Sequence, residues 1–305
     1  MTSTLNADHP QLHVTQAQGV RLAHFEWHAA QRGQGPTVWL VHATGFHGRV
    51  WDQAVRHLPA SRHVIAIEQR CHGRSEAVPF DRWALFGQDQ AAQIDACGLS
   101  AAGAIGVGHS MGAHALVQAA VLRPGAFKRL ILVDPVMVEP AAYQLPPVPL
   151  GELHPAANRK NHFESAQAMF DRFADRPPYA VFNRQALMDY CTHGLRPADD
   201  GRGFQLCCAP RHEGQVYPLA RNNPNTYDLV HALHIPVLVV RARAQDPSIK
   251  PWDPLGSPTW PGLAAEFPQG RDLFQPDKTH FLPMEDPVLM AQLIEAELAA
   301  TSIPT

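Results

Sequence analysis

Residues 104–114 read Ala-Ile-Gly-Val-Gly-His-Ser-Met-Gly-Ala-His and contain a G-x-S-x-G pentapeptide centred on Ser110. The apolar run 105–107 before it is typical of a buried strand, and the apolar residues after it recur at helical spacing. A serine at a tight turn between a strand and a helix forms a nucleophile elbow. Side chains at these glycine positions would strike neighbouring backbone, so the turn requires Gly108 and Gly112. The sequence therefore predicts that Ser110 projects outward, beside the first amides of a helix.

Strands and helices alternate on both sides of this turn. Residues 11–30 read as strands, and short apolar runs that predict further strands lie at 38–41, 64–67, 130–133, 236–240 and 272–274. Helical spacing appears at 50–58, at 83–97 and in a terminal helix that opens with Asp286 as its cap and Pro287 in its first turn. This alternation predicts an α/β fold with a mostly parallel central sheet covered by helices on both faces.

The alternation stops between residues 138 and 228. That segment has a proline-rich connector and two helix-like stretches, 162–174 and 179–193, but no apolar strand run. We therefore expect a core made of 11–137 and 229–305, an inserted and mostly helical cap at 138–228, and a flexible tail at 1–10.

The composition excludes several classes of partner. The chain has 305 residues, of which 45% are hydrophobic and 17% charged, and a net charge of −3 without any run of Lys or Arg. We therefore expect neither a nucleic-acid partner nor a membrane partner. With no apolar signal segment at the N-terminus and no stretch of membrane-spanning length, a cytoplasmic protein is expected. The five cysteines and 18 histidines show no metal-ligand spacing, so no metal is expected.

A nucleophilic serine needs a base, and the base needs an acid that orients it. His280 lies in a loop between the last strand and the terminal helix, at the edge where open parallel sheets place their sites. Two acids compete for the third place, because both follow a strand and lie between Ser110 and His280 in the chain. We favour Asp246, which is one strand closer to the loop of His280, and keep Asp134 as the alternative.

The oxyanion of an acyl-transfer reaction needs two backbone amides. One is expected at Met111, immediately after the nucleophile, and the other at Thr44, in the loop that follows the strand 38–41. Aromatic residues beside these loops are candidates for an apolar substrate pocket: Phe46, Trp252 and Phe281. Two further histidines are expected to support loops through hydrogen bonds: His72 and His109.

With these residues placed, the chain resembles the α/β-hydrolase superfamily, in its capped, esterase-like branch. The resemblance rests on the loop 42–46, the segment 70–75, the turn 108–112, Asp246 and the run 279–281. Two positions depart from the usual pattern: Ala43 stands where a glycine normally follows the histidine, and Cys71 where a glycine normally precedes His72. Serine at the nucleophile position argues against haloalkane dehalogenases and epoxide hydrolases, which are similar but use aspartate.

The resemblance and the residues together predict a hydrolase that cleaves a small, largely apolar carboxylic ester or lactone through an acyl-serine, without metal or organic cofactor. An amide substrate is left open. The same three residues could instead catalyse C–C bond hydrolysis of a vinylogous diketone, or perhydrolysis. A ligand receptor that retains the fold is a third, non-enzymatic alternative, because fold alone does not fix function.

Overall fold

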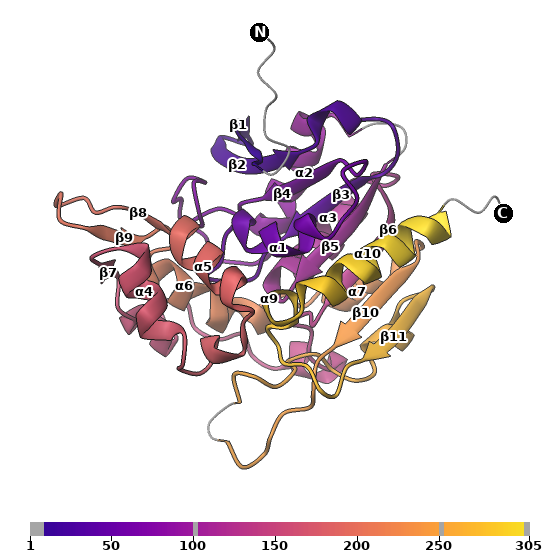
Figure 1. Cartoon of the computed structure of the whole chain (residues 1–305). Coiled ribbons are helices and arrows are strands. Elements are labelled where there is room, and N and C mark those ends of the chain that lie inside the picture. The colour runs from indigo at the N-terminus through magenta and orange to yellow at the C-terminus, as the bar shows by residue number, and fades with distance from the viewer. Residues whose placement is uncertain (1–8, 100–102, 250–252, 302–305) are drawn as a thin grey trace, which may run out of the picture.

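A computed structural model of the chain describes residues 9–99, 103–249 and 253–301. At its centre lies an eight-stranded sheet in the order β1-β2-β4-β3-β5-β6-β10-β11 (Figure 1). The six strands from β4 to β11 run parallel, whereas β1 and β2 pair antiparallel at one edge. The predicted mostly parallel α/β sheet is confirmed. Its strands are β1 (Gln11–Ala17), β2 (Val20–Trp27), β3 (Thr37–Val41), β4 (Val64–Ile67), β5 (Ala104–His109), β6 (Phe127–Val133), β10 (Val237–Arg241) and β11 (Gly270–Phe274).

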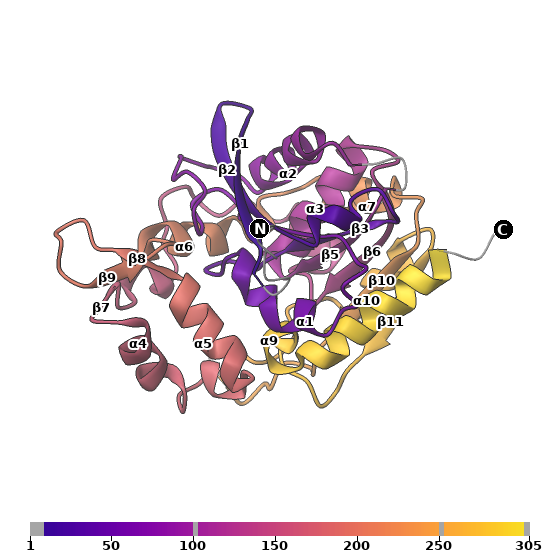
Figure 2. The ribbon, with the colours of Figure 1, turned by 45° about the horizontal axis from the view of Figure 1, so that its top comes forward.

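Helices cover both faces of this sheet because its central strands are apolar on both sides. In β3, Val38 and Leu40 pack toward α1 and α10, while Trp39 and Val41 pack toward α2, α3, α7 and α8. Figure 2 shows these two helical layers on opposite sides of the sheet. The helices are α1 (Asp52–Arg56), α2 (Ala84–Cys97), α3 (Met111–Leu122), α7 (Thr226–His231), α8 (Leu263–Glu266), α9 (Leu282–Glu285) and α10 (Pro287–Thr301), with short 3₁₀ turns η1 (Ala29–Gln31) and η2 (Gly48–Trp51).

The segment between β6 and β10 gathers beside the carboxyl edge of the sheet (Figure 1). Its elements are η3 (Pro140–Gln144), η4 (Pro155–Asn158), β7 (His162–Phe163), α4 (Ala166–Phe173), η5 (Tyr179–Val181), α5 (Arg184–His193), β8 (Leu195–Pro197), β9 (Phe204–Leu206), α6 (Pro210–Val216) and η6 (Tyr217–Arg221). Besides the expected helices it holds a small antiparallel sheet, β7-β9-β8, whose strands are too short to give an apolar run. The expected boundary at residue 228 falls inside α7, which packs against α3 and α8.

The turn between β5 and α3 has the geometry that the pentapeptide predicts. Ser110 adopts φ 57° and ψ −122°, a backbone conformation that residues with side chains rarely adopt. A Cβ atom at Gly108 would lie 2.6 Å from the Cα of Ala113, and one at Gly112 would lie 2.3 Å from the backbone oxygen of His42. Both glycines are therefore required by close backbone approach, and together they let Ser110 stand at the tip of the turn.

We predict that Gly112→Ala lowers the free energy of unfolding by about 1–3 kcal/mol or more, because backbone must move to admit the methyl group. Gly35→Ala is the matched control, since a Cβ atom there would meet nothing within 4 Å. Chemical denaturation of both variants measures the difference. Equal stabilities for the two variants would contradict the steric account of the turn.

Candidate active site

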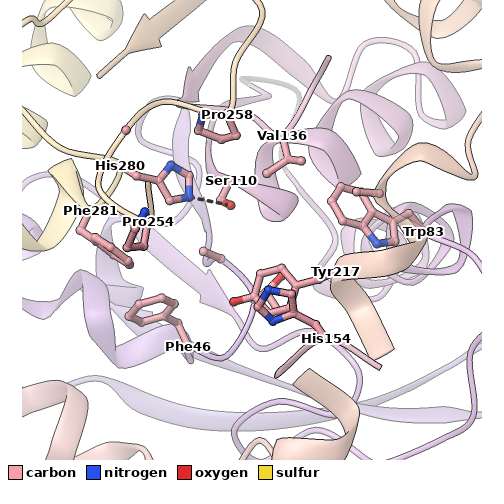
Figure 3. Close-up of a pocket in the computed structure, with 14 residues that line it drawn as sticks. Phe46, Trp83, Ser110, Val136, His154, Tyr217, Pro254, Pro258, His280 and Phe281 are labelled. Atoms are coloured by element: carbon pink, nitrogen blue, oxygen red, sulfur yellow. Dashed lines mark hydrogen bonds between the residues drawn. The ribbon is translucent and has the colours of Figure 1, made fainter. Parts of the chain in front are cut away.

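Ser110 and His280 are brought together from segments far apart in the sequence. His280 lies in the loop between β11 and α9, and its ring points toward the serine (Figure 3). The Ser110 hydroxyl lies 3.1 Å from His280 Nε2, a distance at which it donates a hydrogen bond to a neutral imidazole. The loop is held by the backbone amide of His280, which donates to the carbonyl of Leu255 at 2.9 Å. The arrangement is that of a nucleophile and its base.

Asp134 is the carboxylate beside the histidine. Its Oδ2 accepts a hydrogen bond from His280 Nδ1 at 2.6 Å, which fixes the tautomer with a free lone pair on Nε2. Its Oδ1 accepts from the amide of Ala242 at 3.0 Å and from the hydroxyls of Ser257 and Thr259 at 2.5 and 3.3 Å. Burial raises the pKa of this carboxyl, but these hydrogen bonds and His280 outweigh burial, and the pKa lies below its usual value.

The preference for Asp246 as the orienting acid is wrong in this structure. Asp246 Oδ1 accepts hydrogen bonds from the amide and hydroxyl of Ser248, at 2.8 and 2.7 Å, within its own loop. Asp246 lies five residues beyond the end of β10, far enough along the chain for the loop to carry it away from His280. The same loop returns two hydroxyl groups, those of Ser257 and Thr259, to Asp134.

The register of β5 against β6 explains why Asp134, and not Asp246, contacts His280. In the parallel ladder between β5 and β6, His109 is the partner of Val133, so Ser110 and Asp134 are the next residues on adjacent strands. The sequence does carry a signal that favours Asp134, namely how far each acid lies from the end of its strand. Asp134 directly follows the apolar run 130–133, whereas Asp246 lies five residues beyond the end of β10.

The loop after β3 carries Thr44, the residue predicted to supply one of the two oxyanion amides. Gly45 has φ +79°, and its amide donates to His72 Nε2 at 3.0 Å. Within the part of the chain that the structure describes, neither the amide of Thr44 nor that of Met111 donates a hydrogen bond to another residue. Thr44 lines the same cavity as Ser110 and His280, and Met111 is the first residue of α3. The two predicted amides thus belong to a residue that lines the cavity of Ser110 and to the residue that follows Ser110 in the chain.

A cavity of about 320 Å³ opens beside Ser110 and His280 (Figure 3). Two of the three predicted pocket residues, Phe46 and Phe281, line it; the third, Trp252, lies outside the described residues. Trp83, at the start of α2, also lines the cavity, although its helical spacing predicted only a packing role. Other lining residues were not predicted because they come from irregular loops or from the insertion, which carry no periodic signal: Val136, His154, Tyr217, Ala220, Pro254 and Pro258. Most of the wall is apolar, which suits an uncharged part of a ligand.

Buried neutral histidines hold the loops around the site. His109 Nε2 donates to the backbone oxygen of His280 at 2.7 Å, and His72 Nδ1 donates to the backbone oxygen of Arg70 at 2.8 Å. The expected supporting roles of His72 and His109 are confirmed. Burial lowers the pKa of His109 to about 3 and that of His72 to about 4. Since both rings act through one N–H group, their protonation would add a buried, uncompensated charge.

Among the described residues, no three His, Cys, Asp or Glu side chains are grouped so that they could hold a metal ion. Within the same ranges, no helix is both long enough and apolar enough to cross a bilayer.

We predict that acid weakens the fold over a defined pH window. Burial lowers the folded-state pKa of His72 to about 4 and of His109 and His114 to about 3, from an ordinary 6.5. Below pH 6.5 the unfolded chain therefore binds more protons than the folded chain, and stability falls as pH drops from about 6.5 toward 3. Urea denaturation at a series of pH values measures this slope. His114→Gln should make the slope shallower, and a free energy of unfolding that stays flat down to pH 4 would contradict it.

Known proteins show the same architecture. The crystal structure of E-2-(acetamidomethylene)succinate hydrolase matches with a TM-score of 0.75 and 20% identity, covering 94% of this chain and 98% of that one. A thermophilic esterase from Thermogutta terrifontis matches with a TM-score of 0.65 and 20% identity, covering 96% of this chain and 100% of that one. At these identities the likeness concerns the fold.

A curated relative, the (E)-2-((N-methylformamido)methylene)succinate hydrolase of Acinetobacter baylyi, is 27% identical over 110 residues. The match spans 36% of this chain and 41% of that protein. The family model described as "Alpha/beta hydrolase family" matches residues 40–293, which include the serine turn, Asp134 and His280. The chain therefore belongs to the alpha/beta hydrolase family.

Proposed function

We propose that the protein is a serine hydrolase that cleaves a carboxylic ester or lactone through an acyl-enzyme on Ser110. The observation that carries the proposal is the continuous hydrogen-bonded chain from Ser110 through His280 to Asp134, with distances of 3.1 and 2.6 Å. The three side chains stand in the order nucleophile, base and orienting acid.

In the first half of the reaction, His280 Nε2 takes the hydroxyl proton as Ser110 Oγ attacks the carbonyl carbon of the substrate. Asp134 holds the ring in place and stabilises the imidazolium that forms. The amides of Thr44 and Met111 donate to the oxygen that becomes negative in the tetrahedral intermediate. Collapse of that intermediate breaks the ester C–O bond, and His280 returns its proton to the departing alkoxide.

In the second half, a water molecule attacks the acyl-serine while His280 accepts its proton. A second tetrahedral intermediate collapses to release the carboxylic acid, and His280 returns the proton to Ser110. The apolar wall beside the serine, which includes Phe46, Val136 and Phe281, favours a substrate that is apolar near its scissile bond.

We predict that Ser110→Ala lowers kcat for a p-nitrophenyl ester by about 10⁴- to 10⁶-fold and abolishes labelling by a fluorophosphonate, because the nucleophile is gone. Ser248→Ala, a change on an exposed loop, is the matched control and should label normally. Peptide mapping should place the label on Ser110. A folded wild-type protein that takes no label would instead favour the receptor alternative.

We predict that Asp134→Asn lowers kcat by about 10⁴-fold, since an asparagine cannot hold the histidine in the required tautomer. Asp246→Asn removes the same charge from a carboxylate that contacts only its own loop, and should leave kcat within about twofold of wild type. Steady-state kinetics on one ester compare the two variants. The opposite ranking would return Asp246 to the role that the sequence suggested.

Hydrolysis of an amide bond is the second candidate. It is favoured by the names of the curated relative and of the solved hydrolase, whose substrates carry an N-methylformamido and an acetamido group. The same residues would serve, with His280 protonating the nitrogen that leaves. Matched ester and amide substrates with one acyl group separate the candidates, and a diketone included in the panel tests C–C cleavage.

A further inference from the structure

A second cavity, of about 540 Å³, lies next to the first and is bounded mainly by the inserted segment. The two cavities share part of their lining: Thr44, Phe46, His154, Tyr217, Pro254 and Phe281. In Figure 3, Phe46 and Phe281 lie on one side of this shared region and Tyr217 and His154 on the other. A ligand that occupies the first cavity can therefore extend into the second.

The second cavity carries an excess of positive charge. Three cationic side chains line it, those of Arg159, Lys160 and Arg172, against one carboxylate, that of Glu213. Glu213 is already paired, because its Oε2 accepts from Arg159 Nη1 at 2.8 Å. Lys160 and Arg172 are both exposed, and among the residues that the structure describes neither forms an ion pair. The Lys160 ammonium lies 5.2 Å from the centre of the Phe163 ring, a contact that leaves its charge without a counterion. Two positive charges at the cavity wall are thus left without a counterion from the protein.

Arg159 also orients two hydroxyl groups in this cavity. Its Nη2 donates to the phenol oxygens of Tyr179 and Tyr190, at 3.1 and 2.9 Å. Each hydroxyl hydrogen must therefore point away from the guanidinium. The two oxygens lie 3.5 Å apart, so one hydroxyl can donate to the other, but at least one proton is left for another acceptor. Burial raises the pKa of both phenols, which keeps them protonated donors.

We propose that the second cavity is an anion subsite, and that the substrate is an ester with an apolar part at the scissile bond and a carboxylate or phosphate at its far end. The anion would be held by Lys160 and Arg172, with a phenol hydroxyl of the Tyr179–Tyr190 pair as a further donor. An anion attracts such donors more strongly than an uncharged group does. The inference rests on the proposed function, because it concerns the substrate of the same serine.

The test compares mono-p-nitrophenyl esters of linear dicarboxylic acids with p-nitrophenyl alkanoates of equal chain length. The anionic member of each pair should have the higher kcat/KM, and the advantage should shrink as salt is added. Lys160→Met and Arg172→Met keep the apolar stem of each side chain and remove its charge. Each should raise KM for the anionic ester by about three- to tenfold and leave KM for the neutral ester unchanged.

Arg176→Met is the matched control, because Arg176 is exposed on the same segment but does not line the cavity. It should change neither KM. If anionic and neutral esters respond alike in every variant while Ser110 still turns both over, the subsite is refuted and the hydrolase stands.

If neither ester is turned over, calorimetry on Ser110→Ala protein with the free dicarboxylate decides. Salt-sensitive binding that Lys160→Met weakens supports the subsite, and no binding overturns it. Esters that end in a phosphate instead of a carboxylate identify the source of the anion. The subsite prefers the anion, carboxylate or phosphate, whose esters have the lower KM.

Discussion

The site depends on two adjacent parallel strands, β5 and β6, that end at the same level of the sheet. Ser110 and Asp134 follow the register partners His109 and Val133, and both have positive φ, 57° and 44°. Such backbone is unfavourable for residues with side chains and persists only where the surroundings hold it. Here hydrogen bonds between the strands hold it: the amide of Ser110 donates to the backbone oxygen of Val133 at 3.0 Å, and the amide of Asp134 donates to the backbone oxygen of Val240 at 2.7 Å. One imidazole can consequently contact both residues.

Much of this fold is readable in the sequence because the central strands are buried on both faces. Runs such as 64–67 and 130–133 become β4 and the end of β6, and the predicted cap Asp286 accepts from the amide of Leu289 at 3.0 Å. The glycines at 108 and 112 predict the serine turn for the same reason that they are needed there, namely that backbone passes too close for a side chain. These signals are local.

What the sequence could not supply is the path of long loops. The prediction of Asp246 used strand order alone, whereas a contact between its carboxylate and His280 depends on the path that the chain takes after β10 ends at Arg241. The small sheet β7-β9-β8 was not predicted for a related reason. Strands of two or three residues carry no periodic signal and pair only because the rest of the chain brings them together. The register of β5 against β6 is likewise a tertiary property, and it brings Asp134 level with Ser110.

The inserted segment is fastened to the core at several points. Trp83 Nε1 donates to the backbone oxygen of Val216 at 2.9 Å, and the amide of Asn183 donates to the backbone oxygen of Met284 at 2.8 Å. His47 Nε2 donates to the backbone oxygen of Tyr190 at 3.1 Å. The three bonds join separate places along the segment, residues 183, 190 and 216, to separate parts of the core.

The loop after β10 is irregular, but its Ser257 and Thr259 hydroxyls both donate hydrogen bonds to Asp134, the carboxylate that contacts His280. Without these two hydroxyls, Asp134 Oδ1 would accept a hydrogen bond from the amide of Ala242 alone, although the side chain is buried away from water. An engineer who grafts this stretch from another protein of the family would therefore also be changing the hydrogen bonds that hold Asp134 beside His280. The same stretch supplies Pro254, Gly256 and Pro258 to the wall of the cavity, so a graft would alter the cavity wall and the contacts of Asp134 together.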